Sequence, residues 1–363
     1  MPLLATTLLD QFATVLELQH FAGPLEGVQV EGLNSPEQAG PQSLAFASEA
    51  KHLKALRHRP SPPAVLIVSP PLAKALQAEA DPFWRTCCLI QCPNVSLALA
   101  QIARAHFDPG FSRRAFLADQ PIHPTAVIHP SAQVADSAVV GPHTVIGPDV
   151  ILEAQVVVGS HCHLEAGVHV GQGSHIHSHV YLGPQTQLGK LCEIHPMTSI
   201  GTEGFGYAHD SQGEHHRIPH LGRVVLQDRV HIGSNVSMDR GTLDDSVVGA
   251  GTKIDNHCHF GHNFRCGKNC LITGGFISAG SVTLGDRVVV GGRTTISGHL
   301  EVASGVQLAG LSGVPKSLNE AGAYGGYPPQ PVKEHLRTTS TLTHLPQMRK
   351  DISRILKHLK LES

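Results

Sequence analysis

The chain has 363 residues, of which 41% are hydrophobic but only 4% aromatic, and it contains 37 Gly, 25 Pro and 26 His. The charged fraction of 15% lies well below the ~25% of an ordinary globular protein, and a formal net charge of -2 gives no general attraction to nucleic acid or to anionic membranes. Such a length exceeds one compact core and predicts two or three domains.

The sequence carries no recognisable targeting or membrane-spanning segment. A transmembrane helix needs roughly 20 consecutive apolar residues, and the sequence has no such run. The first residues, MPLLATTLLDQF, lack a basic region and reach Asp10 too early for a secretory signal. Eight Cys in a chain of this length are no disulfide framework. We therefore expect a cytoplasmic protein with no integral membrane segment and no nucleic-acid partner.

The first part of the chain, residues 1–118, has the pattern of a small α/β domain. The apolar run Ala64–Val68 follows two prolines and predicts a buried strand, and Cys88–Cys92 predicts another. Asn94–His106 predicts an amphipathic helix. A segment with Pro and Gly at 108–121 then predicts a linker.

A repeat of six residues begins after this linker. Stepping by six gives fourteen positions that are all Ile, Leu or Val: Ile122, Ile128, Val134, Val140, Ile146, Leu152, Val158, Leu164, Val170, Ile176, Leu182, Leu188, Ile194 and Ile200. The column four residues later, from Ala126 to Thr198, contains only small or β-branched side chains. Two columns with the same six-residue phase would rarely arise by chance, so the repeat is a property of the fold.

The six-residue phase breaks twice. It stops after Ile200 and resumes at Leu226, then slips through the sequence DRGTLDDS and continues from Val248 to Val314. The breaks predict two excursions from the repeat, a long one near residues 203–222 and a short one near 239–246.

Six residues with one aliphatic side chain correspond to a short strand and a turn, and three such units make a triangular coil of 18 residues. Coils stack at about 4.8 Å into a three-sided prism, so residues 18 apart lie directly above one another. The narrow interior favours Ile, Val and Leu and excludes most aromatic residues, which explains the composition; Cys266 and Ser278 are the two off-pattern inward positions.

The predicted fold class is mainly β: a parallel β-helix over residues 119–316, with the N-terminal α/β domain and a C-terminal helical tail over 317–363. The hexapeptide repeats resemble the left-handed kind, which is an exception to the right-handed crossover rule, although periodicity alone does not give the hand.

The tail predicts a helix over 332–344, an interruption at Pro346 and a second helix. The second helix has an apolar seam with heptad spacing: Leu345, Met348, Ile352, Ile355 and Leu359. Basic residues occupy other positions: Arg349, Lys350, Arg354, Lys357 and Lys360. The helix either packs on the prism or joins subunits in a bundle with a basic outer face, and the seam favours the bundle.

Sorting the histidines by coil separates two groups. His143, His161 and His179 are 18 residues apart and form an outward column of solvated turn positions. In the segment IDNHCHFGHN, His262 lies at an outward turn, and Gly280 is one coil above it. A base with a backbone N–H one coil away suits acyl transfer, because the base removes an amine proton while the N–H stabilises the oxyanion.

A metal site is the competing interpretation of the same segment. His257 and His262 form an H-x4-H pair, with His220 37 residues before His257. This set resembles the zinc-type site of β-helical carbonic anhydrases, where histidines from two faces of neighbouring subunits meet, and three neutral imidazoles with water suit a catalytic zinc ion. The cysteines, in contrast, fall at inward positions or near a buried strand and are interpreted as core residues: Cys87, Cys88, Cys92, Cys162, Cys192, Cys258, Cys266 and Cys270.

Several motifs in order resemble the UDP-3-O-acylglucosamine N-acyltransferase family, which adds the second acyl chain in lipid A synthesis. The matching stretches are EQAGPQSLAF near 37–46, EGFGYA at 203–208, IPHLGRVVL at 218–226, MDRGTLDDS at 238–246 and KIDNHCHFGHN at 253–263, followed by AGSVTLGDRVVVGG and ISGHL. The resemblance covers nearly the whole chain and implies a homotrimer with active sites between neighbouring prisms.

The resemblance also implies the roles of individual residues. His262 is the expected catalytic base, with His299 as a second active-site histidine, Asp255 as a supporting carboxylate and Gly280 as the oxyanion donor. Asn263 is expected to help hold the acyl-carrier arm. The expected substrates are UDP-3-O-acylglucosamine and an acyl carrier protein whose phosphopantetheine thioester supplies the chain, with the basic C-terminal helix as its docking surface. No metal and no further cofactor are expected.

The N-terminal domain of this family binds the uracil of the sugar nucleotide, and its stacking aromatic corresponds to Phe46. Where the family has a pattern like LSFLANPKY, this chain reads LAFASEAKH, so Glu49 replaces an Asn and His52 replaces a second aromatic. His52 can still stack, but Glu49 cannot donate a hydrogen bond as an amide does. His259 occupies a substrate-side position often held by Gln.

The hypothesis that follows is transfer of a 3-hydroxyacyl chain from acyl carrier protein to the 2-amine of UDP-3-O-acylglucosamine. Two alternatives stay open from the sequence. One is an enzyme resembling the metal-dependent carbonic anhydrases, and the other is a non-catalytic scaffold that binds a sugar nucleotide.

Overall fold

The computed structural model describes residues 3–79, 81–108 and 120–359. The chain divides into two compact units, Met1–Phe111 and Ser112–Ser363. The boundary predicted at residues 118 and 119 lies outside the described residues. Among the described helices, none combines the length and the apolar character needed to cross a bilayer.

The N-terminal unit is built on a five-stranded sheet in the order β2 (Gln19–Ala22), β7 (Cys88–Gln91), β6 (Val65–Val68), β5 (Ser43–Ala47) and β4 (Gly32–Leu33). The pair β2 and β7 is antiparallel and the other pairs are parallel. A second, two-stranded sheet pairs β1 (Leu3–Leu4) with β3 (Gln29–Val30).

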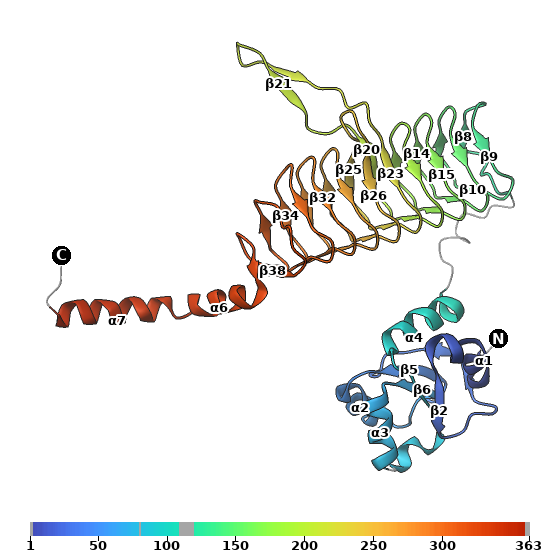
Figure 1. The fold of residues 1–363 in the computed structure, drawn as a ribbon. Coiled ribbons are helices and arrows are strands. Elements are labelled where there is room, and N and C mark those ends of the chain that lie inside the picture. The colour runs from blue at the N-terminus through green and yellow to red at the C-terminus, as the bar shows by residue number, and fades with distance from the viewer. Residues whose placement is uncertain (1–2, 80, 109–119, 360–363) are drawn as a thin grey trace. The chain divides into compact units, whose positions relative to one another are not determined.

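Helices cover both faces of the five-stranded sheet (Figure 1). Residues of α1 (Ala5–Leu16) and α4 (Val95–Ile102) pack in one apolar cluster, and those of α2 (Ala50–Arg57) and α3 (Pro70–Glu79) pack in the other. The 3-10 turn η1 (Pro82–Thr86) precedes β7, and the π-helical turn η2 (Ala103–Phe107) follows α4. The predicted strands at 64–68 and 88–92 and the predicted helix at 94–106 are thereby confirmed.

The second unit is a prism whose three faces are parallel sheets. Face 1 contains β10 (Val139–Val140), β13 (Val157–Val158), β16 (His175–Ile176), β19 (Glu193–Ile194), β24 (His231–Ile232), β27 (Lys253–Ile254), β30 (Leu271–Ile272), β33 (Val289–Val290) and β36 (Gln307–Leu308), extended by β38 (Ala323–Gly325) and β39 (Gln330–Pro331). Face 2 contains β8 (Val127–Ile128), β11 (Val145–Ile146), β14 (His163–Leu164), β17 (Tyr181–Leu182), β20 (Ser199–Thr202), β25 (Ser237–Asp239), β28 (His259–Phe260), β31 (Ile277–Ser278), β34 (Thr295–Ile296) and β37 (Gly313–Val314).

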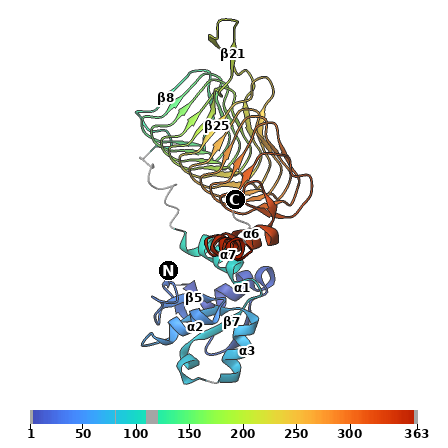
Figure 2. The same cartoon turned by 90° about the vertical axis from the view of Figure 1, so that its left-hand side faces the viewer.

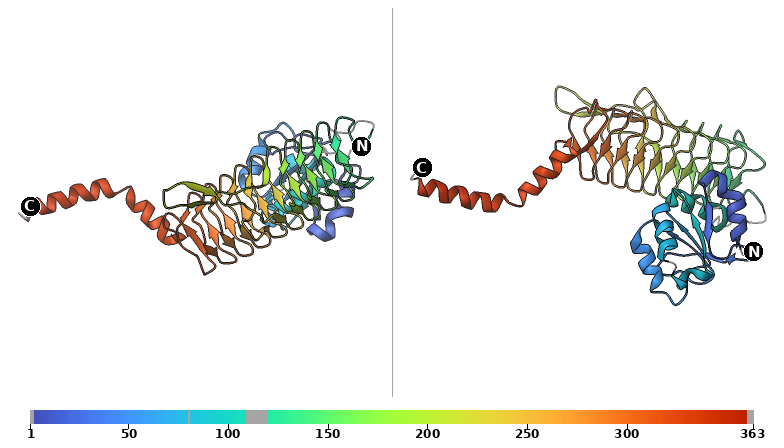
Figure 3. Two further views of the ribbon diagram at one scale, coloured as in Figure 1. Left: turned by 90° about the horizontal axis from the view of Figure 1, so that it is seen from above. Right: turned by 60° about the horizontal axis from the view of Figure 1, so that its bottom comes forward.

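Face 3 contains β9 (Gln133–Val134), β12 (Ile151–Leu152), β15 (His169–Val170), β18 (Gln187–Leu188), β23 (Val224–Leu226), β26 (Ser246–Val248), β29 (Arg265–Cys266), β32 (Thr283–Leu284) and β35 (Glu301–Val302). The chain visits the faces in the order 2, 3, 1, and Figures 2 and 3 show the successive coils stacked along the prism. This architecture confirms the predicted fold class, a left-handed parallel β-helix with an N-terminal α/β region and C-terminal helices.

Each coil is closed by turns whose second residue has a positive φ. Eighteen of the positive-φ positions outside glycine lie in the prism, among them His143, His161 and His179. These three rings stack at centroid separations of 5.0 Å, close to the ~4.8 Å between coils. The predicted outward histidine column is therefore confirmed.

The interior follows the predicted aliphatic column, with one deviation. Phe260, Phe264 and Phe276 are fully buried and pack against one another at centroid distances of 4.7 to 6.4 Å. Phe264 and Phe276 occupy the column that holds small residues in the first half of the prism. Ser278 is the register partner of Phe260, so a small side chain lies next to a large one. The off-pattern residue thus compensates in volume for the aromatic cluster.

The tail contains α6 (Val332–Leu342), which contacts β38 and β39, and α7 (Leu345–His358). The break between the helices falls at residues 343–344, two residues before the predicted interruption, and Pro346 lies in the first turn of α7, where its missing N–H is tolerated. Neither helix has a buried residue, and the seam from Leu345 to Leu359 is about half exposed. Lys360 lies outside the described residues.

Candidate active site

Both excursions leave the prism at the same edge, the corner between faces 2 and 3. The first connects β20 to β23, and the second connects β25 to β26 one coil later. The turn His262–Asn263, between β28 and β29, follows in the next coil. The corner thus brings together the three most distinctive stretches of the sequence.

The first excursion folds back over this corner before it forms the projecting hairpin of β21 (Tyr207–His209) and β22 (His215–Arg217) (Figure 1). A methyl group built on Gly204 would lie 2.9 Å from Cβ of His262 and 3.0 Å from Nε2 of His220. One built on Gly206 would lie 2.8 Å from Cε1 of His220. The two glycines of the EGFG motif are required because the backbone lies directly against two imidazoles.

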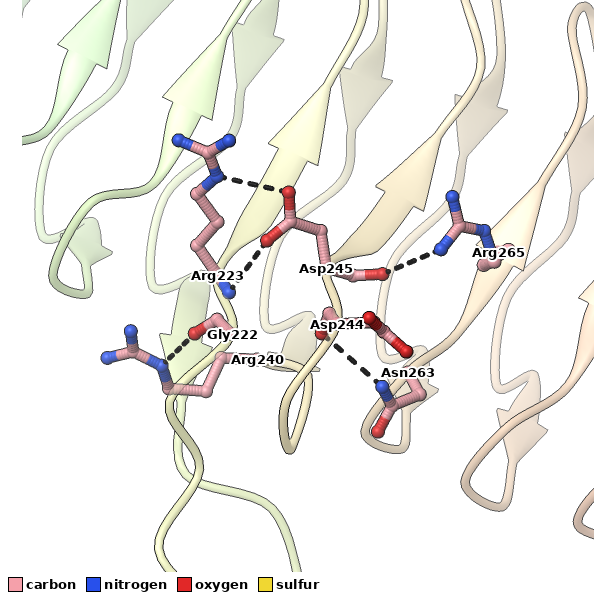
Figure 4. A network of polar contacts seen from close by, with 7 residues as sticks. All are labelled: Gly222, Arg223, Arg240, Asp244, Asp245, Asn263 and Arg265. Atoms are coloured by element: carbon pink, nitrogen blue, oxygen red, sulfur yellow. Dashed lines mark hydrogen bonds and ion pairs between the residues drawn. The ribbon is translucent and has the colours of Figure 1, made fainter.

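The second excursion is held by a polar network (Figure 4). The backbone N–H and the guanidinium of Arg223 donate to the two carboxylate oxygens of Asp245 at 3.2 and 3.1 Å. Arg265 donates to the carbonyl of Asp245, and Arg240 donates to the carbonyl of Gly222. These bonds fix the DRGTLDDS loop against the coils on either side.

The network reaches the expected base through Asn263. Nδ2 of Asn263 donates to the carbonyl of Asp244 at 3.3 Å, and Oδ1 accepts from the backbone N–H of Thr242 at 3.0 Å. Two backbone groups therefore fix which end of the amide is the oxygen. That oxygen lies 2.9 Å from Nδ1 of His262.

This geometry determines the tautomer of His262. Since Oδ1 of Asn263 can only accept, Nδ1 of His262 carries the proton and donates it. Nε2 of the neutral ring then keeps a free lone pair, which is the form a general base needs. Thr242 Oγ1, 3.3 Å from Nδ1, is a second polar neighbour on the same side of the ring.

Gly280, one coil above His262, lies directly against the imidazole ring at Nε2. A methyl group built on Gly280 would be 2.5 Å from Nε2 of His262 and 2.6 Å from Cε1, so only glycine leaves room for the ring. His262 and Gly280 are also joined through the coil ladder, in which Ser281 N–H donates to the carbonyl of His262 at 2.8 Å. The structure thus brings the expected base and the expected oxyanion donor into contact.

The amide of Gly280 differs from the equivalent amides at three other turns. Those amides donate to a side chain one coil above: Ser160 to Ser178 at 3.2 Å, Lys268 to Asp286 at 2.8 Å and Asp286 to Ser304 at 2.9 Å. The residue one coil above Gly280 is Gly298, which has no side chain to accept. A substrate oxygen can take the place that a Ser or Asp oxygen holds elsewhere.

His299 and Asp255 lie further away. The backbone N–H of His299 donates to the carbonyl of Gly280 at 3.0 Å, which places His299 in the same corner but roughly two coil spacings, about 10 Å, above the base. Asp255 lies at the corner between faces 1 and 2, where its carboxylate accepts from the backbone N–H groups of Asn256 and Gly274 at 2.7 and 2.9 Å. Within one chain, Asp255 and His262 therefore occupy different edges of the prism.

Asp239 is a site residue that the sequence analysis did not single out. Its side chain is 7% exposed at the start of the second excursion, and burial raises the pKa of its carboxyl group above the ordinary value. Three nearby imidazoles act against this effect of burial and lower the same pKa: those of His259, His220 and His262. A buried carboxyl group among three imidazoles is the electrostatic centre of this corner.

His220 faces the same cluster. Its ring is 3% exposed and lies 5.3 Å from that of His262 at an angle of 67°. Nδ1 donates to the carbonyl of Ile218 at 3.0 Å, whereas Nε2 is buried and has no hydrogen-bond partner among residues 3–79, 81–108 and 120–359. An acceptor nitrogen is therefore directed into the site.

In the metal interpretation, histidines from two neighbouring subunits meet, so His220, His257 and His262 need not converge within one chain. His220 and His262 are neighbours, but His257 lies at the corner between faces 1 and 2. In the described part of the chain, the groups of three donors that lie close enough to share an ion are His175, His177 and Glu193, and Asp210, Glu214 and His216. Neither group includes the three histidines of the metal interpretation.

In the N-terminal unit, Phe46 lies on β5 and belongs to the apolar core, with 8% of its surface exposed. Glu49 is the N-cap of α2, and Nδ1 of His52 accepts from the backbone N–H groups of Ser48 and Glu49 at 3.2 and 3.3 Å. A shallow pocket of about 330 Å³ lies beside the predicted nucleotide motif and is lined by Glu31, Gly32, Asn34, Gln38, Gly40, Pro41, Gln42 and Ser43. The roles of Phe46 and His52 stay predictions.

Comparison with known proteins agrees with these observations. The family model for UDP-3-O-(3-hydroxymyristoyl) glucosamine N-acyltransferase, LpxD, matches residues 28–105. A model of the GMPPB C-terminal domain matches residues 122–204.

Two curated proteins called UDP-3-O-acylglucosamine N-acyltransferase are similar in sequence. The one from Methylorubrum populi is 44% identical over 152 residues, 42% of this chain and 43% of that protein, and the one from Campylobacter lari is 43% identical over 138 residues, 38% of this chain and 43% of that protein. The matched segment thus spans less than half of the length of these relatives.

Among solved structures, a UDP-N-acetylglucosamine acyltransferase from Francisella novicida has a TM-score of 0.42 and 24% identity, over 56% of this chain and 66% of that one. LpxA from Acinetobacter baumannii has a TM-score of 0.41 and 26% identity, over 61% of this chain and 78% of that one.

The raised pKa of Asp239 predicts an unusual effect of Asp239→Asn on stability. A carboxyl group whose pKa is higher in the folded state takes up a proton on folding. The stability of the fold therefore falls as the pH rises from the pKa of the unfolded state through the pKa of the folded state. Removing the charge should therefore raise the thermal midpoint at pH 8, by about 2 °C or more, and the gain should shrink toward pH 4. Thermal unfolding over a pH series measures this.

The matched control is Asp244→Asn, because Asp244 lies in the same excursion but is exposed. It should leave the midpoint unchanged at every pH. A loss of stability in Asp239→Asn at pH 8, or a gain independent of pH, would contradict the electrostatic account of this corner.

Proposed function

We propose that the chain is a member of the UDP-3-O-acylglucosamine N-acyltransferase family, whose proteins it resembles in sequence, and that it transfers a 3-hydroxyacyl chain from an acyl carrier protein thioester to the 2-amine of UDP-3-O-acylglucosamine. This reaction adds an acyl chain in lipid A synthesis. The observation that carries the proposal is the pairing of a free Nε2 on His262 with the Gly280 amide at one corner of the prism.

In the proposed mechanism the sugar amine attacks the thioester carbonyl. His262 Nε2 accepts the amine proton as the C–N bond forms, and the Gly280 N–H donates to the oxygen that gains negative charge. The tetrahedral intermediate then collapses, the C–S bond breaks, and the protonated His262 returns its proton to the departing thiolate. Asn263 stabilises the imidazolium through the bond to Nδ1 in both steps.

A homotrimer is part of the same proposal. Asp255 and His262 lie on different edges of one prism, so Asp255 reaches the base only if a neighbouring prism supplies it. His299, about two coils above His262, is then placed to contact substrate and not the base itself. The exposed apolar seam of α7 supports a bundle that joins subunits, with its basic residues left for an acidic acyl carrier protein.

Recognition of the UDP group is assigned to the N-terminal unit, with Phe46, His52 and the neighbouring pocket as the proposed contacts. His259, on face 2 beside Asp239, is proposed to contact the sugar. A cytoplasmic location belongs to this proposal as well.

Replacing His262 by Ala should lower turnover by about 100-fold to 10,000-fold, since that is the usual contribution of a general base. His161→Ala is the matched control, because His161 is an exposed turn histidine of the same prism and should leave turnover unchanged. The assay is mass spectrometry of the diacylated product formed from acyl carrier protein thioester and UDP-3-O-acylglucosamine.

Near-normal turnover of the His262→Ala protein would contradict the mechanism. A wild-type protein that binds UDP and forms no product would instead favour the non-catalytic scaffold. Zinc or iron held by His220, His257 and His262 in a protein that forms no diacylated product would favour the carbonic-anhydrase-like alternative.

Replacing Glu49 by Asn should tighten binding of UDP. An amide can donate to a uracil carbonyl where a carboxylate cannot, and one such bond changes affinity by roughly 2-fold to 10-fold. Asn also replaces Glu49 as the N-cap of α2, so the helix keeps its start. Calorimetric titration of the full chain with UDP measures the effect.

Titration with ADP should give no gain, and neither should Glu26→Asn, a change at an exposed position of the same unit. Equal affinity of the wild type and Glu49→Asn for UDP would place the uracil elsewhere.

A further inference from the structure

Four polar side chains on face 1 form a square on two neighbouring strands. His175 on β16 and Glu193 on β19 are register partners and face outward. The intervening residues face the core, so His177 and His195 face outward again two positions later. The backbone N–H of His177 donates to the carbonyl of Ile194 at 2.8 Å, so the ladder continues between the two strands at this point.

The four side chains converge on one another. His177 Nε2 lies 3.0 Å and His195 Nε2 lies 3.7 Å from the same oxygen, Oε1 of Glu193. The rings of His175 and His177 stack at 4.3 Å, and those of His177 and His195 stack at 4.6 Å. Donor atoms of His175, His177 and Glu193 all lie within 4.8 Å of one another, and all four side chains are half-buried.

Imidazole nitrogens and a carboxylate oxygen are the ligands that zinc prefers in proteins. Donors at roughly 2.1 Å from a tetrahedral zinc ion lie roughly 3.4 Å apart, so small rotations of these side chains bring them to coordination distance. The backbone needs no movement, because the ladder already holds β16 against β19.

We propose that this square is a binding site for one zinc-type divalent cation, with His175, His177 and Glu193 as ligands and His195 as the fourth. Four protein ligands leave no open position, which is the pattern of a structural site. The ion would join two coils of face 1 next to the coil that carries the first excursion. His231, the register partner of Glu193 on its other side, belongs to the same polar face.

The site is separate from the acyl-transfer corner. It lies on face 1, whereas His262, Gly280 and both excursions lie at the corner between faces 2 and 3. Its occupation therefore does not depend on the proposed reaction. A second group of donors, Asp210, Glu214 and His216, lies exposed at the hairpin and is the internal competitor that an experiment must exclude.

The test is a calorimetric titration of the full chain with zinc chloride after removal of metal by a chelator. The wild type should bind one zinc ion per chain at the square, with a dissociation constant of about 1 μM or tighter, and its thermal midpoint should rise with zinc concentration. The double variant His177→Gln, His195→Gln should weaken binding by roughly 100-fold. Gln can keep a hydrogen bond to Glu193, so circular dichroism should show the prism intact.

Two variants serve as controls. His169→Ala removes a similar histidine–glutamate pair on face 3, with Glu153 at 2.9 Å, that belongs to no group of three close donors among the residues the structure describes. His216→Ala removes the donor of the hairpin group. Both should keep the binding affinity of the wild type. Absence of zinc binding below millimolar concentration, unchanged binding in the double variant, or loss of binding in either control would overturn the proposal.

Discussion

The backbone ladder between successive coils is the constraint on which the rest of the prism depends. In the regular coils it holds residues 18 apart in register, such as Phe260 and Ser278, through bonds such as those from Ser281 to His262 and from His299 to Gly280. Every outward residue is thereby assigned to a column along an edge or a face. The candidate site follows from this assignment, because two breaks in the repeat, a histidine and a glycine all fall on one edge. A shift of one residue in the repeat would distribute them over different faces.

The same corner concentrates groups that are unfavourable for folding. Asp239 is a buried carboxyl group with a raised pKa. Nε2 of His220 is a buried acceptor that has no hydrogen-bond partner among the described residues. Buried polar groups without partners cost stability, and natural proteins concentrate such conflicts at functional sites. The polar network of Figure 4 offsets this by holding the second excursion against Asn263 and its neighbours.

The sequence alone predicts the features that depend on period and column. The β-helix, the edge occupied by His262, the position of Gly280 one coil above it and the outward stack of His143, His161 and His179 all follow from steps of six and 18. The confirmed elements of the N-terminal unit follow from apolar runs bounded by turn residues.

Features that depend on irregular backbone are not predictable in this way. Asp239 ends β25 and Thr242 lies in the loop that follows, where the repeat is broken, so no column assigns them to the base. The two glycines of the EGFG motif gave the only signal that the first excursion folds back against imidazoles. Steps of 18 relate His175 to Glu193 and His177 to His195, but the square is apparent only when these two columns, which lie two residues apart, are considered together.

The most direct test of the central claim concerns the Gly280 amide and uses Gly298. Gly298→Ser places a hydroxyl one coil above Gly280, where Ser304 and Ser178 accept from equivalent amides at other turns. Gly298→Ala adds the same Cβ without the acceptor. If the amide stabilises the oxyanion, Gly298→Ser should lower turnover by about 100-fold to 1,000-fold while Gly298→Ala keeps most of it. Equal turnover of the two variants would contradict the account.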